Sequence, residues 1–234
     1  MDVQNNNQEQ RYTMQHEILG GNLPVAIMYP QFGQTLYSQG GAMSWMSPNM
    51  DMSTNSGGLG RGLSRMFAGE SFFLNYYTSK NGPGTIAMSS KFPGTIRALE
   101  LDGSRSYILQ KQSFLAATDG IRQDVILQRN IGSGLFGGEG FVLQKLSGVG
   151  TLFIEIDGFA WETTLAPGQE IVVSSGYLAY MDDTCTLDIQ QVPGWKNKFF
   201  GGEGWFNTVI KGPGKVVLQT HPLSSMAALF YTGD

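Results

Sequence analysis

The sequence predicts an all-β fold built from three internal β-repeats, and two observations carry that prediction. The first is composition: glycine supplies 32 of the 234 residues, whereas charged residues make up only 15%. An average globular chain has roughly half this share of glycine and about 25% charged residues. Collagen is excluded because the glycines have no period of three, and wholesale disorder is excluded because 41% of the residues are hydrophobic. The second observation is a Gly-Glu phrase that occurs three times.

The repeated phrase centres on a glutamate and is followed each time by a Gly-x-Gly segment. The glutamates are Glu70, Glu139 and Glu203, which are 139 − 70 = 69 and 203 − 139 = 64 residues apart. The Gly-x-Gly segments occupy 82–84, 148–150 and 212–214. This spacing predicts a disordered polar N-terminus (1–11), one all-β domain (12–230) with repeats at about 12–81, 82–147 and 148–220, and a C-terminal tail (221–234).

Each repeat is expected to contain about five short strands separated by Gly and Pro turns. The β-type runs ahead of the Gly-Glu phrases are 25–29, 35–37 and 41–46; 96–101, 107–109 and 113–117; and 161–165, 171–173 and 176–181. The turns between the first two runs contain Pro30 and Gly33, Asp102-Gly103, and Pro167-Gly168. We expect these turns and the Gly-x-Gly segments to close hairpins. Such spacing is typical of a sandwich, barrel or prism.

The strand after each Gly-Glu phrase has apolar residues on both faces, as in 141–146. A strand with one wet face alternates, so these strands should be covered twice, by a partner sheet and by a neighbouring subunit. Short helical turns are expected at 63–67 and 223–230, and an exposed flexible loop at 51–62.

Several phrases together resemble one protein family. They are Gly-Gly-Ala-Met-Ser-Trp-Met (40–46), Arg-Met-Phe-Ala-Gly-Glu-Ser-Phe-Phe (65–73), Phe-Gly-Gly-Glu-Gly (136–140 and 200–204) and Thr-His-Pro-Leu (220–223). Over about 12–230 the chain resembles the altered-inheritance-of-mitochondria family and its bacterial relatives. The resemblance implies a pseudo-threefold all-β fold like that of the tryptophan RNA-binding attenuator protein, and it implies no biochemical activity.

Charge and targeting signals exclude several classes of protein. The net charge is −4 and the basic residues are scattered singly, so no nucleic-acid partner is expected. The first eleven residues resemble neither a signal peptide nor the Arg-rich leader of the family's mitochondrial members, and no apolar run approaches a membrane span of about 18 residues. We therefore expect a cytoplasmic protein. The single cysteine, Cys185, reads as a buried, inert strand residue.

Glu70, Glu139 and Glu203 are the only charged residues present in all three copies of the phrase, which makes them weak candidates for a metal site. If a pseudo-threefold brought them together, the three carboxylates would need a bound cation or raised pKa values. The favoured alternative is that each carboxylate accepts hydrogen bonds from amides of its own turn. Calcium-dependent stabilisation that disappears in Glu139→Gln would support the cation site.

No other pattern predicts chemistry. His16 and His221 lack both triad context and zinc-ligand spacing, so no catalytic residue and no cofactor are expected. The segment 132–137 fits G-x-G-x-x-G but precedes a strand, where that motif does not bind dinucleotides. Paired-carboxylate hydrolysis is disfavoured because the acids occupy different places in each copy. We expect a solvated face instead for Glu100, Asp102, Glu155, Asp157 and Glu162.

One apolar stretch favours an interface over ordinary core, because it lies beside the Gly/Ser-rich loop and is not repeated. Its residues are Met43, Trp45, Met46, Leu59, Leu63 and Met66. The expected role is a non-enzymatic binding or scaffolding protein that forms a homo-oligomer, with a trimer favoured. The alternatives are a small-ligand binder or enzyme with a site between repeats, and a protein that associates with a membrane surface through 43–67.

Overall fold

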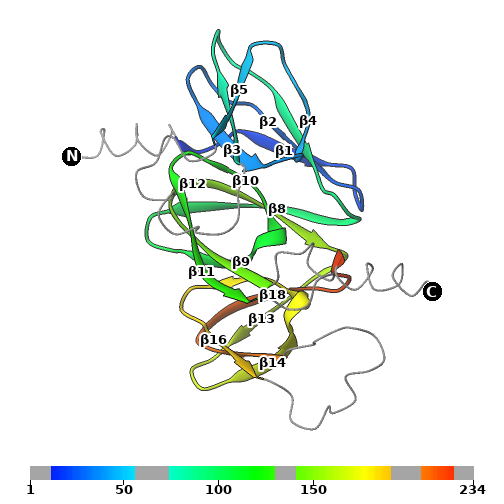
Figure 1. Cartoon of the computed structure of the whole chain (residues 1–234), viewed down its shortest axis with the longest axis vertical. Helices are drawn as coiled ribbons and strands as arrows, with labels where there is room; N and C mark the ends of the chain where they lie inside the picture. Colours follow the sequence, from blue (N-terminus) through cyan, green and yellow to red (C-terminus); the bar gives the residue numbers. More distant parts are fainter. Residues whose placement is uncertain (1–11, 56–73, 130–140, 191–206, 224–234) are drawn as a thin grey trace. The chain divides into compact units, whose positions relative to one another are not determined.

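A computed structural model of the chain describes residues 12–55, 74–129, 141–190 and 207–223, and these are all-β as the sequence predicts (Figure 1). The strands are β1 (His16–Leu19), β2 (Val25–Met28), β3 (Thr35–Gln39), β4 (Met43–Met46), β5 (Met50–Asn55), β6 (Leu74–Ser79), β7 (Ile86–Ser89), β8 (Gly94–Asp102), β9 (Tyr107–Gln110), β10 (Phe114–Thr118), β11 (Ile121–Arg129), β12 (Phe141–Asp157), β13 (Ala160–Leu165), β14 (Glu170–Ser174), β15 (Leu178–Asp182), β16 (Thr186–Gln190), β17 (Asn207–Lys211) and β18 (Gly214–Gln219). Two short 3-10 helices, η2 (Lys111–Ser113) and η3 (Ser175–Tyr177), precede β10 and β15. Within these residues no helix is long and apolar enough to cross a membrane.

The chain divides into two compact units, and the first comprises 1–106, 114–124 and 146–155. It contains a four-stranded antiparallel sheet in the order β1-β2-β7-β4 (blue to blue-green in Figure 1). A second antiparallel run in the same unit joins β10 to β3, β3 to β6 and β6 to β5, with β10 also pairing to residues 152–154 of β12.

The core of the first unit is formed by side chains from both of these groups of strands. The large members with almost no exposed surface are Met14, Met28, Leu36, Tyr77, Ile86, Met88, Leu115 and Phe153. Because residues two apart on a strand face the same side, Ala26 and Met28, and Ile86 and Met88, enter this core together. Met43 and Met46 of β4 pack against its margin.

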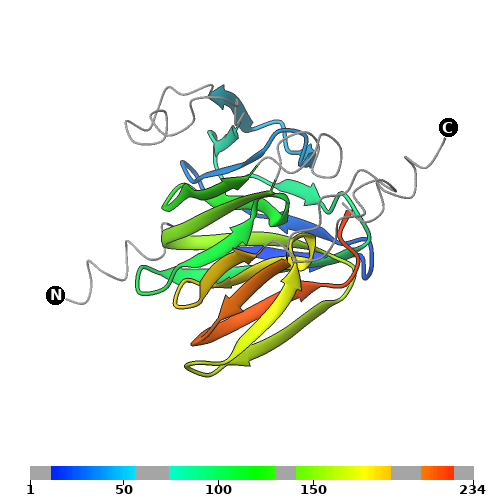
Figure 2. The ribbon, with the colours of Figure 1, turned by 60° about the horizontal axis from the view of Figure 1, so that its bottom comes forward.

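The second unit comprises 107–113, 125–145 and 156–234. One antiparallel run joins β13 to β18, β18 to β15 and β15 to β9. A separate three-stranded sheet has the order β14-β17-β16. Figure 2 shows the yellow, orange and red strands of this unit running side by side. Its core includes Phe141, Leu143, Leu178, Met181, Ile210, Val216 and Cys185.

The predicted turns are in place, but they do not close hairpins. β2 pairs with β1 and β7, whereas β3 pairs with β10 and β6. The Gly-x-Gly segments behave in the same way, because β6 and β7 belong to different sheets, as do β17 and β18. The hairpin expectation is therefore wrong. Most of these turns are corners where the chain leaves one sheet for another, while the turn at Asp102-Gly103 joins β8 and β9, which both pair with β12 and not with each other.

The middle Gly-x-Gly segment departs further from the expectation, because β12 runs through it without a turn. Gly148 and Gly150 have φ values of 119° and 147°, which favour glycine. A Cβ at Gly148 would collide with the carbonyl oxygen of Gly120, and one at Gly150 would collide with Oγ1 of Thr118. Glycine is thus required here by close backbone approach, and β12 supplies residues to both units.

Three strand pairs have an irregularity of register, which lies in β4, β10 and β15, the strands formed by the runs 41–46, 113–117 and 176–181. The register shifts between Met43 and Trp45 where β4 pairs with β7, between Phe114 and Ala116 where β10 pairs with β12, and between Leu178 and Tyr180 where β15 pairs with β18. A bulge of one residue bends the strand and strengthens its local twist. The extra residues are Ser44, Leu115 and Ala179.

The strand that follows the second Gly-Glu phrase is covered on both faces, as expected. Phe141, Val142, Leu143 and Gln144 are all buried within one chain, so this coverage requires no neighbouring subunit. The flexible loop predicted at 51–62 is wrong for its first part, because Asp51 to Asn55 belong to β5. The rest of that loop, the helical turn at 63–67 and most of the turn at 223–230 lie outside the described residues.

Candidate functional site

The interface predicted from sequence falls on β4, the last strand of the four-stranded sheet. Trp45 is 49% exposed although it lies opposite the buried Ala87 of β7. Met43 and Met46 are half-buried against the core, so they combine packing with exposed surface. β4 therefore presents an apolar edge; the other interface candidates, Leu59, Leu63 and Met66, lie outside the described residues.

β14 is a second apolar edge, which the sequence analysis did not single out. It ends the three-stranded sheet, pairing with β17 from Glu170↔Lys211 to Ser174↔Asn207. Val172, in the middle of the strand, is 62% exposed. Tyr37 and Ile108, which hold corresponding places in β3 and β9, are buried, so the exposure of Val172 became visible only in the structure.

β4 differs in charge from the other strands that pair on one side only within the described residues. Edge strands usually carry charged side chains, which deter association with other edges. Seven of the one-sided strands contain at least one charged residue: β1, β5, β8, β11, β13, β14 and β16. β4 contains none, and the only charge of β14 is Glu170 at its first position, held at 2.8 Å by Lys211.

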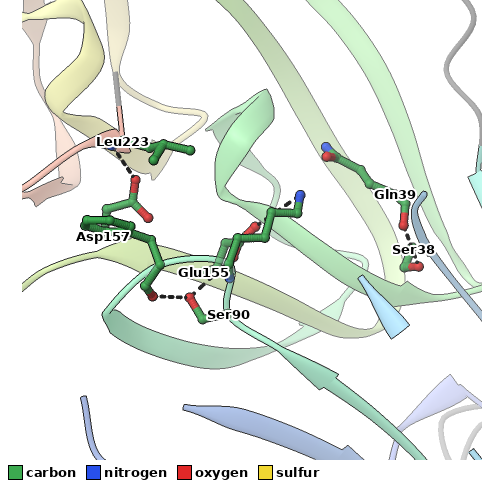
Figure 3. Close-up of polar contacts among 8 residues, drawn as sticks. Ser38, Gln39, Ser90, Glu155, Asp157 and Leu223 are labelled. Carbon is green, nitrogen blue, oxygen red and sulfur yellow. Dashed lines mark hydrogen bonds and ion pairs between the residues drawn. The ribbon is translucent and has the colours of Figure 1, made fainter. Parts of the chain in front are cut away.

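Glu155 of β12 contradicts the expectation of a solvated acidic face, because only 4% of its side chain is exposed. Its carboxylate accepts the backbone N–H of Lys91 at 3.0 Å and the hydroxyl of Ser90 at 3.4 Å (Figure 3). The Lys91 ammonium lies 3.7 Å away. This arrangement ties the segment between β7 and β8 to β12, so we assign Glu155 a structural role.

The remaining acids fit the solvated expectation more closely. Glu162 and Asp102 are exposed, and hydrogen bonds from the side chain and backbone of Ser104 lower the pKa of Asp102. Asp157 is half-buried and accepts the N–H of Leu223 at 2.7 Å (Figure 3). Each acid is thus engaged in its own local contacts.

Glu100 and Met14 both bond to one threonine in the first unit, Thr151, and His16 lies beside Met14. The hydroxyl of Thr151 lies 2.8 and 2.9 Å from the two carboxylate oxygens of Glu100, and it accepts the N–H of Met14 at 2.8 Å. Desolvation raises the pKa of Glu100, against the opposing effects of the Thr151 hydrogen bond and of His16. His16 packs edge-on against Phe153, with ring centroids 5.0 Å apart, and its Nδ1 lies 2.8 Å from the Met14 carbonyl. The cluster anchors the N-terminal segment.

The other sequence candidates are not brought together. His221 is exposed, in the segment after β18. Cys185 is buried as predicted, although it lies in the bend before β16 rather than in a strand; burial, and then the Asp182 carboxylate, raise its pKa. No group of three or more potential metal ligands occurs among the described residues, and Glu70, Glu139, Glu203 and the segment 132–137 lie outside them.

Comparison with known proteins decides the family. A family model described as mitochondrial biogenesis AIM24 matches residues 16–221. The chain belongs to the AIM24 family. The resemblance expected from the Gly-Glu phrases is thereby confirmed.

Two bacterial proteins extend the AIM24 match. The chain is 31% identical over 213 residues to an uncharacterized protein of Streptococcus pyogenes serotype M6, covering 87% of this chain and 84% of that protein. The fold is similar to that in an X-ray crystal structure of a Streptococcus pyogenes protein, with a TM-score of 0.76 and 27% sequence identity. That similarity covers 93% of this chain and 98% of the other.

Proposed function

We propose that this AIM24-family chain is a non-enzymatic binding or scaffolding protein that works as a homo-oligomer, with a trimer favoured, built from three β-repeats. The proposal includes the pseudo-threefold arrangement, the fold likened to that of the tryptophan RNA-binding attenuator protein, and the cytoplasmic location. The observation that carries it is the pair of apolar, nearly uncharged sheet edges formed by β4 and β14.

The strand registers support three repeats. β7, which follows residue 81 and which we count with the first copy, pairs with β2 on one side and with the bulged β4 on the other. In the third copy β18 pairs with β13 and the bulged β15 in the same way. Likewise β6 pairs between β3 and β5, and β17 pairs between β14 and β16. In the second copy the single long strand β12 takes the place of both central strands: it pairs with β8 and the bulged β10, and also with β9 and β11.

The exposed residues of the two edges support self-association. A free strand edge offers unpaired backbone groups to another chain, and proteins commonly suppress this with charge or proline. β4 and β14 lack proline and are almost free of charge, while Trp45 and Val172 keep large apolar surfaces in solvent. Burying such surface stabilises a complex by about 25 cal/mol per Å² before the cost of association.

The buried acid supports a structural rather than a chemical role for the first unit. The carboxylate of Glu155 is occupied by the Lys91 amide and the Ser90 hydroxyl, which are contacts that hold a turn. A catalytic acid must reach the proton that it transfers.

Light scattering coupled to size exclusion tests the proposal. One chain has a mass of 25.5 kDa, so a trimer has 3 × 25.5 = 76.5 kDa. A mass that is a multiple of 25.5 kDa at micromolar concentration supports the homo-oligomer, and 76.5 kDa supports the trimer. A single-chain mass at micromolar concentration refutes the proposal.

A further inference from the structure

Within the part of the chain that the structure describes, β4 and β14 each end a sheet, whereas their counterparts in the other proposed repeats do not. The counterparts of β4 are β10 and β15, which have the same bulge. The counterparts of β14 are β3 and β9, which occupy the same place before the 3-10 turn or the bulged strand. β10 pairs with β3, and β15 pairs with β9. The chain therefore makes this antiparallel junction twice, between a bulged strand of one copy and an unbulged strand of the copy before it.

The two junctions have the same register, from which a third can be derived. In the first, Ala116 lies opposite Ser38; in the second, Tyr180 lies opposite Leu109. From the first copy to the second, equivalent residues are 71 positions apart: Ser38 corresponds to Leu109 (109 − 38 = 71), and the bulge residue Ser44 to Leu115 (115 − 44 = 71). The residue of β4 that corresponds to Ala116 is therefore Trp45 (116 − 71 = 45). From the second copy to the third the offset is 180 − 116 = 64, so the residue of β14 that corresponds to Leu109 is Val173 (109 + 64 = 173).

The third junction would thus place Trp45 opposite Val173 and Met46 opposite Val172. Burial supports this register. Ala117 and Tyr37 face each other in the first junction, Met181 and Ile108 in the second, and all four side chains are buried. Their counterparts, Met46 and Val172, are half-buried and 62% exposed.

The position before Met46 shows the same contrast in burial. Ala116 and Tyr180 are buried at the two junctions that form, whereas Trp45 is 49% exposed. Trp45, Met46 and Val172 are therefore more exposed than the residues that occupy their places in the two junctions that form, whereas Val173 faces the core and is buried like its counterparts Ser38 and Leu109.

We propose that β14 of one copy of the chain adds antiparallel to β4 of a second copy, with Met46 opposite Val172, and so joins copies head to tail. The inference rests on the homo-oligomer of the proposed function and specifies how its copies meet. Strand addition provides main-chain hydrogen bonds for affinity, while alternate side chains set the register. A head-to-tail interface uses two different surfaces, so it closes into a ring or continues as a filament.

A disulfide trap tests the register directly. Residues opposite each other on antiparallel strands have Cα atoms roughly 4.5–5.5 Å apart, within the range of a disulfide. The double variant Met46→Cys/Val172→Cys should give, after oxidation, a ladder of cross-linked multimers on a non-reducing gel. The native Cys185 is buried and leaves this readout clean.

The matched control moves one cysteine to a different edge. Met52 lies on β5, another edge strand, and is 47% exposed, similar to Trp45. Met52→Cys/Val172→Cys should give no ladder above that of the wild type. Equal ladders from both double variants, or a disulfide formed within one chain by the first, would overturn the proposed pairing.

A charge placed on the edge gives an independent readout. Val172→Lys puts an ammonium group at the centre of the proposed junction, on a side chain whose exposure makes the change tolerable for the fold. Light scattering should show its mass fall to 25.5 kDa, while Met52→Lys keeps the mass of the wild type. Circular dichroism checks that both remain folded.

The outcomes separate the two proposals. A wild-type chain that is already a monomer defeats the homo-oligomer and the junction together. A wild-type oligomer whose mass survives Val172→Lys, and whose double-cysteine variant gives no ladder, leaves the oligomer standing and overturns the β14–β4 junction alone.

Discussion

Replacement of Glu155 by glutamine tests whether this buried acid is structural. The carboxylate is 4% exposed and accepts hydrogen bonds from the Lys91 amide at 3.0 Å and the Ser90 hydroxyl at 3.4 Å. Glutamine keeps one acceptor oxygen and the shape of the side chain. It removes the negative charge 3.7 Å from the Lys91 ammonium and turns an NH₂ group toward existing donors.

The expected loss follows from the contacts that are weakened. A hydrogen bond to a charged group contributes about 1.5–3 kcal/mol, and a buried donor left without its acceptor costs about 1–3 kcal/mol. Both bonds end on Oε2, so the glutamine oxygen can accept both, but as weaker neutral bonds of about 0.5–1.5 kcal/mol each, while the NH₂ group faces the Lys91 ammonium. We therefore expect Glu155→Gln to lower the free energy of unfolding by about 1.5–3 kcal/mol. In a chain of this size each kcal/mol shifts the melting temperature by roughly 2–4 °C, so the expected decrease is about 3–12 °C.

Thermal unfolding followed by circular dichroism measures the effect, with Glu162→Gln as the matched control. Glu162 is exposed, and the ammonium of Lys215 lies 4.0 Å away from its carboxylate. An exposed pair of this kind contributes about 0–1 kcal/mol and is screened by salt, whereas the Glu155 loss should persist in high salt. Equal losses from the two variants, or an unchanged melting temperature in Glu155→Gln, would refute the structural role.

Three further variants probe the packing. Tyr37→Phe should lose about 0.5–1.5 kcal/mol in urea unfolding, because the buried Tyr37 hydroxyl donates to a backbone carbonyl at 3.1 Å. Tyr76→Phe, its cross-strand neighbour, should lose less; a larger loss would contradict this assignment. Glu100→Gln should stabilise the chain above pH 4.5, because a raised pKa means that ionisation costs stability in the folded state, and the gain should vanish in acid. A gain that is equal at all pH values would contradict that reasoning. Cys185 should resist iodoacetamide until urea unfolds the chain, since burial raises its pKa; rapid labelling of the folded chain would contradict that.

The individual strands could be predicted from the sequence because they depend on local chemistry. Six β-type runs became β2, β3, β8, β9, β13 and β14, with ends that differ by at most two residues. Pro30, Gly103 and Gly168 lie in the connections as expected, and the positive φ of the two glycines explains why they do. Local turn chemistry thus fixed where strands stop.

The membership of strands in sheets could not be predicted in the same way. A Gly-containing turn between two β-runs looks alike whether the chain folds back on itself or crosses to another sheet. The difference lies in partners far away in sequence, such as Ser38 with Ala116. For the same reason Glu155 read as a solvated acid, because the segment that covers it is some 64 residues earlier in the chain.

If the chain is built from three repeats as proposed, the two ends of its four-stranded sheet differ. Stacked repeats need a capping element where the neighbour is missing. At one side of the first sheet the chain supplies such a cap: β1 pairs with β2 from His16↔Met28 to Leu19↔Val25 and brings the charge of Glu17 to the new edge. At the other side β4 is the last strand among the described residues and has no charge, although His16–Leu19 shows that four residues suffice to add a cap. A sheet that is capped at one edge and uncovered at the other is consistent with another strand that covers β4 in the assembly. The counterparts of β4, which are β10 and β15, pair with β3 and β9, and the strand of this chain that corresponds to β3 and β9 is β14.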